Sequence, residues 1–494
     1  MPFPDPPPNT PSVTNLDWRQ LDPSSITPQE TPFRVLILPR AEHVKISAHG
    51  GASRPDNWVE VNTGNSGEPT KLFALGANKE YIGCSVTHDD IHFIMYFNTE
   101  HRDDHLVLYN RSEHPFHAVS LYGDRREEVG SWAYFELTVG EWLILTDDER
   151  LIEVKVLERD HWRVIPSLSS KRPAEESAVS QKKVRLSAKL GFVRDQVRVG
   201  VGELSYTLKH LAITSDHPRT RVCRAQHSEI PGKVVAVKVV KTANAGEDAT
   251  VYAAESWLRE TAMHSSIGNH VAVAHYLGAD ARFHSIYTEY VNAPTLKEQR
   301  DLKFRFTGNR VMAWRILSDM AGALSFLHEQ KIAHGDVKLD NILYNPMRGA
   351  VLIDFATSFK EGKPIQGGGS PWYLPPEYLL DWRLRSPASD IWALGVVMMW
   401  VLGRIPLPES TASWNIGDLH PYGTVKEANT KAQERMRNWG DRVQDARVLP
   451  DQQPDEIQEI VNGLLEEQEG RTTAANLVQQ VMQSNLVSKP VSEQ

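Results

Sequence analysis

The stretch Ile332-Ala-His-Gly-Asp-Val-Lys-Leu-Asp-Asn-Ile-Leu343 places polar side chains of different chemistry between two apolar flanks. Asp336 can accept a proton from a hydroxyl group, Lys338 can neutralise a growing negative charge, and Asn341 can hold a metal ion. Each of these residues alone is ordinary for a solvated loop. The set is more specific than its members because four residues keep fixed offsets, namely His334, Asp336, Lys338 and Asn341.

This pattern resembles the catalytic loop of eukaryotic protein kinases, in which His, Asp, Lys and Asn keep these spacings. Asp354-Phe355 follows Asn341 after 354 − 341 = 13 residues, the usual gap in that family. The resemblance implies that Asp336 acts on a protein hydroxyl and that Lys338 neutralises the γ-phosphate of ATP. It also implies that Asn341 and Asp354 bind Mg²⁺. We therefore expect an α+β bilobal kinase fold.

A second segment, Val234-Val-Ala-Val-Lys-Val-Val240, resembles the kinase strand that carries a conserved lysine. The resemblance implies that Lys238 binds the α- and β-phosphates and pairs with Glu260 on the following helix, with Glu255 as the alternative partner. Lys238 and Glu260 thereby join the predicted catalytic set. Ser215, Val222 and Ala236 are predicted to line the nucleotide. In the segment resembling the hinge, Thr288 would be the gatekeeper, and Glu289 and Val291 would adjoin the adenine.

The loop that should cover the phosphates departs from the family. Its three glycine positions fall on Ser215, His217 and Thr220, and Pro218 removes one backbone donor. Glycine there lets backbone N–H groups approach phosphates closely. We expect Asp216 to add a charge of the wrong sign, and we therefore expect weaker nucleotide affinity than in an ordinary kinase.

The end of the kinase-like region carries three further matches. Ser370 stands where serine/threonine kinases have a threonine near the catalytic residues, which favours Ser or Thr over Tyr as the acceptor. Glu377 is expected to form a buried ion pair with Arg471, and Asp390 is expected to brace the catalytic loop.

Gly335 replaces the arginine that in the family pairs with a phosphorylated activation segment. Control by such phosphorylation is therefore less expected here, although Thr357, Ser358 and Tyr373 remain available as sites.

The resemblance to protein kinases covers residues 206–486. The composition of the whole chain limits the other classes of function. The formal charge of −9 over 494 residues gives no footprint for nucleic acid. Two cysteines, Cys84 and Cys223, argue against a disulfide framework and fit a reducing compartment. The proline-rich start does not read as a secretory signal. The longest apolar run, Ile391–Leu402, is too short to span a bilayer. We expect a soluble intracellular protein with no direct partner among nucleic acids or membranes.

Residues 1–30 are rich in Pro, Ser, Thr and Asn and are predicted to be disordered. Residues 33–158 read as short alternating strands with turn residues between them, which predicts an all-β sandwich. This region also resembles the forkhead-associated domain, a phosphothreonine-binding sandwich. The segments that carry the resemblance are Leu75-Gly76, Ile91-His92-Phe93, Leu108–Ser112 and Leu137–Leu145.

The departures from that family concern its phosphate pocket. Ala77 stands at the position of its phosphate-binding arginine, and Asp89 at that of its phosphate-binding serine. A carboxylate there would repel phosphate. Asn110 and Arg111 could supply part of a substitute site. The expected ligand of this domain is therefore a protein or phosphoprotein.

Residues 159–186 are predicted to be a linker with two basic clusters, Lys171-Arg172 and Lys182-Lys183-Val-Arg185. Their spacing looks like a bipartite nuclear-import signal, and a solvated linker is the alternative. We therefore expect a nuclear or cytoplasmic location.

Two functions remain open from the sequence. The first is an ATP- and Mg²⁺-dependent serine/threonine kinase that acts on protein substrates. It is supported by a complete set of residues, namely Lys238, Glu260, Asp336, Lys338, Asn341 and Asp354. The second is a pseudokinase or scaffold, which the glycine-free loop and the altered phosphothreonine pocket favour.

Overall fold

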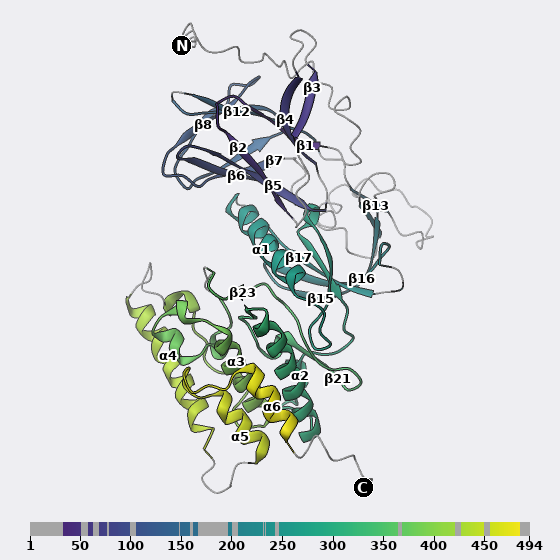
Figure 1. Cartoon of the computed structure of the whole chain (residues 1–494), viewed down its shortest axis with the longest axis vertical. Helices are drawn as coiled ribbons and strands as arrows, with labels where there is room; N and C mark the ends of the chain where they lie inside the picture. Colours follow the sequence, from purple (N-terminus) through teal and green to yellow (C-terminus); the bar gives the residue numbers. More distant parts are fainter. Residues whose placement is uncertain are drawn as a thin grey trace, which may run out of the picture. The chain divides into compact units, whose positions relative to one another are not determined.

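The computed structural model describes residues 33–50, 58–62, 69–76, 79–98, 105–147, 149–158, 162–165, 196–199, 206–230, 232, 234–242, 247–363, 368–419, 426–448 and 455–484. The chain divides into two compact units (Figure 1). Unit 1 contains residues 1–262 and 277–288, and unit 2 contains residues 263–276 and 289–494. The predicted disordered tail, residues 1–30, lies outside the described residues.

The first part of unit 1 is a sandwich of two sheets, coloured purple to blue in Figure 1. One sheet has the order β3-β4-β1-β12-β11-β8-β9 and the other β10-β7-β6-β5-β2. Every strand pairing in both sheets is antiparallel. The strands are β1 Phe33–Pro39, β2 Lys45–Gly50, β3 Trp58–Asn62, β4 Pro69–Gly76, β5 Tyr81–His88, β6 Ile91–Phe97, β7 His105–Asn110, β8 Phe116–Ser120, β9 Arg126–Val129, β10 Tyr134–Thr138, β11 Gly140–Leu145 and β12 Arg150–Val156.

Both sheets contribute to one buried apolar core, because alternate residues of a strand face the same side. Val35 and Ile37 of β1 meet Phe93 and Met95 of β6 in this core, and all four are almost fully buried. The short strands predicted over residues 33–158 are present. The pattern of alternating apolar residues did not predict strands β2, β3, β5 and β9.

The second part of unit 1 is a seven-stranded sheet with the order β13-β14-β15-β16-β17-β19-β18. Its strands are β13 Trp162–Ile165, β14 Gln196–Val199, β15 Tyr206–Asp216, β16 Thr220–His227, β17 Val234–Val240, β18 Tyr276–Asp280 and β19 Ser285–Glu289. Strand β13 falls inside the segment predicted to be a linker. It pairs with β14, and β14 pairs with β15, so the sheet begins before the predicted domain start at residue 206.

Helix α1, Glu247–Ser266, follows β17, and its residues Val251, Ala253, Ala254 and Trp257 are buried. Trp257 of α1 is 1% exposed, and its indole N–H donates to the carbonyl of Ser285 on β19 at 2.9 Å. This bond ties the middle of the helix to the sheet. This bond also helps to fix the position of Glu260, three residues later, relative to β17.

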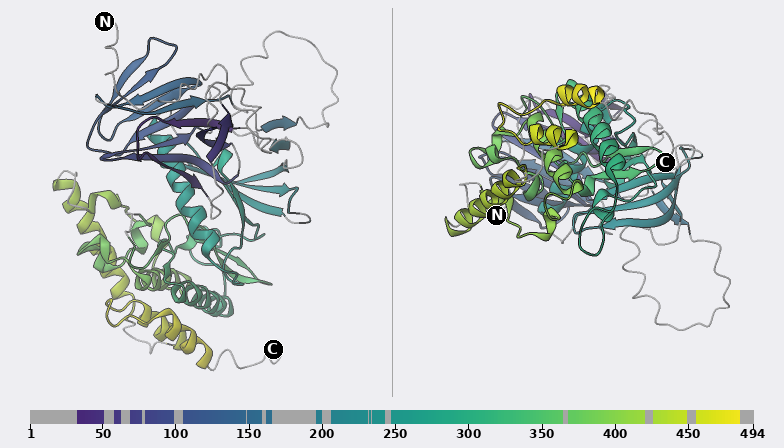
Figure 2. Two further views of the ribbon diagram at one scale, coloured as in Figure 1. Left: turned by 45° about the horizontal axis from the view of Figure 1, so that its top comes forward. Right: turned by 90° about the horizontal axis from the view of Figure 1, so that it is seen from below.

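Unit 2 is mainly helical (Figure 2). Its helices are α2 Arg310–Glu329, α3 Pro387–Val401, α4 Lys426–Asp445, α5 Glu456–Leu464 and α6 Ala474–Gln483. Helix α3 is buried on all sides from Ser389 to Val401, as the apolar run in its sequence predicts. Two short strand pairs frame the loops beside it, β20 Ile332–Ala333 with β23 Phe359–Lys360, and β21 Ile342–Asn345 with β22 Gly349–Leu352. None of the helices in the described ranges is both long and apolar enough to cross a membrane.

Candidate active site

The predicted catalytic loop leaves β20 and is anchored on helix α3 by a single carboxylate. Asp390 is 1% exposed, and it accepts hydrogen bonds from the backbone N–H groups of His334 and Gly335, both at 2.8 Å, and from the His328 ring at 3.0 Å. Burial opposes the ionisation of Asp390. The hydrogen bonds, led by that of His328, outweigh burial and hold the pKa of this carboxyl below its usual value. The brace predicted for Asp390 is therefore present.

His334 is fully buried and links the loop to the segment that precedes Asp354. Its Nδ1 accepts the N–H of Asp336 at 3.3 Å, so its Nε2 carries the proton and donates to the carbonyl of Ile353 at 3.1 Å. The Ile353 N–H in turn donates to the carbonyl of Asn341 at 2.9 Å. These bonds fix the backbone on both sides of the predicted metal-binding residues.

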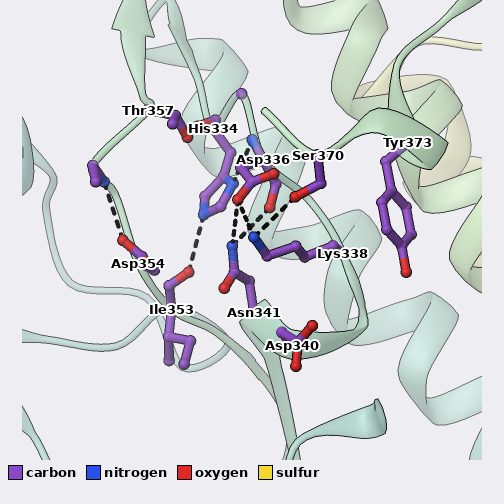
Figure 3. A network of polar contacts seen from close by, with 12 residues as sticks. His334, Asp336, Lys338, Asp340, Asn341, Ile353, Asp354, Thr357, Ser370 and Tyr373 are labelled. Atoms are coloured by element: carbon purple, nitrogen blue, oxygen red, sulfur yellow. Dashed lines mark hydrogen bonds and ion pairs between the residues drawn. The ribbon is translucent and has the colours of Figure 1, made fainter. Parts of the chain in front are cut away.

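Two polar side chains of the loop, Lys338 and Asn341, converge on the Asp336 carboxylate (Figure 3). Lys338 Nζ donates to Asp336 Oδ2 at 2.5 Å and to Ser370 Oγ at 3.0 Å. Asn341 Nδ2 donates to the same carboxylate oxygen at 3.2 Å and to the Asp336 carbonyl at 2.8 Å. Asp336 Oδ1 has no hydrogen-bond partner among the described residues. One carboxylate oxygen is thus held by an ammonium and an amide, and the predicted role of Asp336 as a proton acceptor would fall to the other oxygen.

Asn341 and Asp354 fit the oxygen-donor set that Mg²⁺ prefers. The amide nitrogen of Asn341 is used by Asp336, which leaves its amide oxygen as the group able to bind a cation. Asp354 has a left-handed backbone, φ 67°, and its Oδ1 accepts the N–H of Ala356 at 3.3 Å. Three or more His, Cys, Asp or Glu side chains do not cluster into a metal site anywhere in the described ranges.

The predicted catalytic pair of unit 1 is also formed. Lys238 Nζ of β17 lies 2.9 Å from Glu260 Oε1 of α1, and the Glu260 side chain is only 3% exposed. The alternative partner, Glu255, is instead bonded to Arg111. The chemical role of the Lys238–Glu260 pair stays a prediction.

Strand register brings three of the predicted nucleotide residues beside Lys238. Ser215 of β15 is opposite Val222 of β16, and Val222 is opposite Lys238 of β17. Directly opposed residues share one face of a sheet, and Ala236 shares it too because it precedes Lys238 by two positions. The strand register therefore places Ser215, Val222 and Ala236 on the same sheet face as Lys238.

The glycine-free loop is a tight hairpin between β15 and β16. Its turn is closed by the His217 N–H, which donates to the Thr220 carbonyl at 2.8 Å. Residues 215–220 all keep negative φ angles, so the backbone does not need the left-handed freedom of glycine. The absence of glycine is thus compatible with this turn.

The structure corrects the expectation for Asp216. This residue is opposite Arg221, one position away from Ser215 and Val222, and therefore lies on the sheet face away from Lys238. Its carboxylate is bonded to Arg221 Nη2 at 2.9 Å and to Lys241 Nζ. The bonds to Arg221 and Lys241 lower the pKa of Asp216 to about 2. The charge of Asp216 is therefore neutralised by Arg221 and Lys241, and its side chain does not face the predicted phosphate site.

Because Ser215 and Asp216 face opposite sides of the sheet, substitutions at the two positions should have different effects. Asp216→Asn should leave the KM for ATP within about twofold, because the removed charge lies on the far face and is already neutralised. Ser215→Asp should raise that KM about tenfold, because it puts a like charge beside Lys238 on the phosphate face. Initial rates measured against ATP concentration at fixed Mg²⁺ test both. Equal effects of the two variants would contradict the assigned faces.

The predicted hinge residues lie at and just after the end of β19. Thr288 is half-buried, and Val291 is 7% exposed. Glu289 binds Arg348 through two hydrogen bonds of 2.6 and 2.9 Å, and its backbone N–H donates to the His275 carbonyl at 3.0 Å. The Glu289 side chain is therefore engaged within the protein, so an adenine contact at Glu289 would have to use its backbone carbonyl.

Two of the residues proposed for the N-terminal phosphate pocket have structural roles. The Asn110 amide is fully buried and donates to the carbonyls of His114 and Gly130, both at 2.9 Å. Arg111 pairs with Glu255 of α1. Both side chains are thus already bonded within unit 1, and a substitute phosphate site at Asn110 and Arg111 stays a prediction. Asp89 is exposed, and Ala77 lies outside the described residues.

Two site residues were missed by sequence reasoning. Lys241 compensates Asp216 from 25 positions away, and only the strand register of β16 and β17 reveals it. Arg385 reaches the catalytic loop from the segment before α3, where it donates to the Gly335 carbonyl. Its only sequence signal is a lone arginine near Asp390, which is not specific.

Comparison with known proteins agrees with this geometry. The family described as the protein kinase domain matches residues 220–483, which is more than half of the chain. Serine/threonine-protein kinase kin-29 of Caenorhabditis elegans is 34% identical over 132 residues, which are 26% of this chain and 16% of that protein.

Two further relatives match similar fractions. The SNF-related serine/threonine-protein kinase of Homo sapiens is 36% identical over 110 residues, or 21% of this chain and 14% of that protein. The probable serine/threonine-protein kinase KIN1 homolog of Encephalitozoon cuniculi is 29% identical over 192 residues, or 36% of this chain and 32% of that protein. The aligned part of the chain thus spans less than a third of each of these three proteins.

Proposed function

The chain belongs to the protein kinase family, and we propose that it is an ATP-dependent serine/threonine protein kinase. The observation that supports this most is that Lys338 and Asn341 both bind one oxygen of the Asp336 carboxylate, while Ser370 holds Lys338 and the second carboxylate oxygen is left for an acceptor hydroxyl. The proposed substrates are serine or threonine side chains of proteins. The acceptor preference rests on Ser370, whose Oγ lies 3.0 Å from Lys338 Nζ.

In the proposed mechanism, Asp336 Oδ1 accepts a hydrogen bond from the acceptor hydroxyl and takes its proton as the new P–O bond forms. Lys338, fixed by Asp336 and Ser370, stabilises the negative charge of the transferring group. Burial opposes the charged form of Lys338, but Asp336 outweighs burial and raises the pKa of this ammonium. Lys338 therefore remains a cation throughout the neutral pH range.

The remaining residues are proposed to hold the nucleotide and metal. Lys238, kept in place by Glu260, would bind the α- and β-phosphates. Asn341 and Asp354 would hold Mg²⁺, which when bound neutralises phosphate charge. The face of the sheet that carries Ser215, Val222 and Ala236 would cover the nucleotide.

The direct test is incubation of the purified full chain with labelled ATP, Mg²⁺ and a generic Ser/Thr protein substrate. We expect label on serine or threonine, and none in a matched Asp336→Asn sample. A chain that binds partners but gives no label above that control would support the pseudokinase or scaffold alternative. Label on tyrosine alone would contradict the role given to Ser370.

For the N-terminal sandwich, residues 33–158, we propose binding of a protein ligand. The support is the antiparallel sandwich and the resemblance to forkhead-associated domains. Because Asn110 and Arg111 are engaged, we expect the ligand not to depend on a phosphothreonine bound by these two residues. Paired phosphorylated and unphosphorylated peptide arrays probed with the full chain test this, and selective capture of the phosphothreonine forms would contradict it.

The proposed location is the nucleus or the cytoplasm. The support is the pair of basic clusters between residues 171 and 185, which lie outside the described residues. Replacement of Lys171, Arg172, Lys182 and Lys183 by alanine should move a fluorescently tagged chain from nucleus to cytoplasm. An unchanged distribution in live-cell imaging would contradict nuclear import through these clusters.

A further inference from the structure

The catalytic loop contains a position that leaves no room for a side chain. Gly335 has a left-handed backbone, φ 79°. A Cβ on this residue would lie 2.5 Å from the Thr357 carbonyl oxygen and 2.7 Å from Arg385 Nη2. Both distances are far below ordinary contact, and the first involves backbone that cannot move aside. The space next to Gly335 is therefore already filled, and one of the groups that fill it is a guanidinium.

Arg385 supplies this guanidinium from outside the loop. The residue precedes α3 in sequence and is only 5% exposed. Its Nη2 donates to the Gly335 carbonyl, and its guanidinium carbon lies 5.3 Å from the centre of the Phe359 ring. The same nitrogen would lie 3.7 Å from a Cβ placed on Gly369. One planar cation thus contacts the catalytic loop and lies near Phe359 and Gly369 of the activation segment, residues 354–377.

Arginine suits this position better than other residues. Its planar group can stack on an aromatic ring and donate to a carbonyl in the same plane. Burial lowers the pKa of Arg385, while Tyr378, Asp390 and Asp336 oppose that shift. The nearby carboxylates of Asp390 and Asp336 therefore favour a buried cation at this point.

The hydroxyl groups of the activation segment are already engaged in the same arrangement. Residues 354–377 contain four of them, on Thr357, Ser358, Ser370 and Tyr373. Ser358 Oγ donates to the His334 carbonyl at 2.9 Å, and Thr357 Oγ1 contacts the same oxygen at 3.4 Å. Tyr373 is 3% exposed and donates to Glu409 at 2.9 Å, which corrects its expected availability as a phosphorylation site. With Ser370 bonded to Lys338, each of these four hydroxyls has a partner among the described residues.

We propose that Arg385 is a positioning residue that holds the Gly335–Asp336 backbone against the activation segment, so that the catalytic loop is ordered without phosphorylation of that segment. The proposal rests on the proposed kinase function and specifies how its base is placed. Arg385 does not touch the acceptor hydroxyl in this scheme. It acts through the Gly335 carbonyl, one peptide unit from Asp336.

The test compares variants of the full chain by hydrogen–deuterium exchange and by steady-state kinetics. Arg385→Met keeps the volume of the side chain but removes the donor to Gly335, and Arg385→Lys restores a donor. Arg383→Met is the matched control, because Arg383 is an exposed arginine two positions earlier that pairs with Asp381. We expect Arg385→Met to speed amide exchange in residues 334–337 and 357–360 and to leave the exchange of α2 unchanged.

In kinetics, Arg385→Met should lower kcat at least about tenfold, the scale of one lost charged hydrogen bond, with the KM for ATP within about twofold. Arg385→Lys should recover most of kcat, and Arg383→Met should match the wild type. The wild type should keep its activity after treatment with a broad-specificity phosphatase.

Three results would overturn the proposal. They are unchanged exchange and kcat in Arg385→Met, a loss in Arg385→Lys as large as in Arg385→Met, and loss of wild-type activity on phosphatase treatment. If Arg385→Met does not fold, Arg385→Lys and the phosphatase treatment decide. A wild type with no activity would refute the proposed function instead, and exchange at residues 334–337 would still report whether Arg385 holds the loop.

Discussion

Asp336→Asn is expected to reduce kcat for protein phosphorylation by about 10²–10⁴-fold, the range for loss of a general base. The substitution preserves the shape of the side chain. One oxygen can still accept from Lys338 and Asn341, as Oδ2 does now at 2.5 and 3.2 Å. The other position becomes an NH₂ group, which donates where Oδ1 must accept. The defect should therefore appear in the chemical step.

Affinity for ATP separates this prediction from a general loss of structure. Asp336→Asn should bind ATP with nearly wild-type affinity in isothermal titration, because Asp336 acts on the acceptor hydroxyl. Asp354→Asn should weaken Mg²⁺-ATP binding as well as kcat, because it removes a carboxylate proposed to hold the metal. Wild-type turnover in both variants would show that the assigned roles are wrong.

Local sequence patterns predicted those parts of the site that lie close together in the chain. His334, Asp336 and Asn341 occupy one loop, and the resemblance of their spacing to the kinase catalytic loop predicted a common site. The Lys238–Glu260 and Glu377–Arg471 ion pairs join distant segments, and they were predicted through family resemblance rather than from spacing. Both pairs are present in the structure.

The features that the sequence did not predict depend on register or on packing between distant segments. The direction of Asp216 follows from its pairing with Arg221, and a shift by one residue would turn it to the phosphate face. Arg385 was missed because its partner is the backbone carbonyl of Gly335, 50 positions away, and a carbonyl leaves no trace in sequence. The hydrogen bond from the buried Tyr373 hydroxyl to Glu409 also joins residues that lie far apart in the sequence.

Loss of Arg471 is expected to have the largest effect on stability. Its guanidinium is fully buried and binds Glu377 with two hydrogen bonds, of 2.7 and 3.0 Å. It also donates to the carbonyls of Ala388 at 3.0 Å and Glu466 at 3.1 Å, and it lies over the Trp392 ring. Arg471→Met leaves a buried carboxylate without its cation, which costs roughly 3–5 kcal/mol in comparable buried pairs.

The double variant Glu377→Met with Arg471→Met decides whether the unpaired charge causes that loss. If it does, the double variant should be more stable than Arg471→Met alone, because no charge remains buried. It should still be less stable than the wild type, since the carbonyls of Ala388 and Glu466 lose a donor in both variants. Urea unfolding of the full chain, followed by tryptophan fluorescence, measures the free energies of unfolding.

Arg310→Met provides the control, because it breaks the pair with Asp455, in which both side chains are 45% exposed. Screening by water limits that pair to about 1 kcal/mol or less. If Arg471→Met and Arg310→Met destabilise the chain equally, burial is not the source of the effect. If the double variant is as unstable as Arg471→Met, the cost lies in the two orphaned carbonyls and the lost contact with Trp392. The buried ion pair would then fix the geometry of the segment that carries Ser370 without contributing to stability.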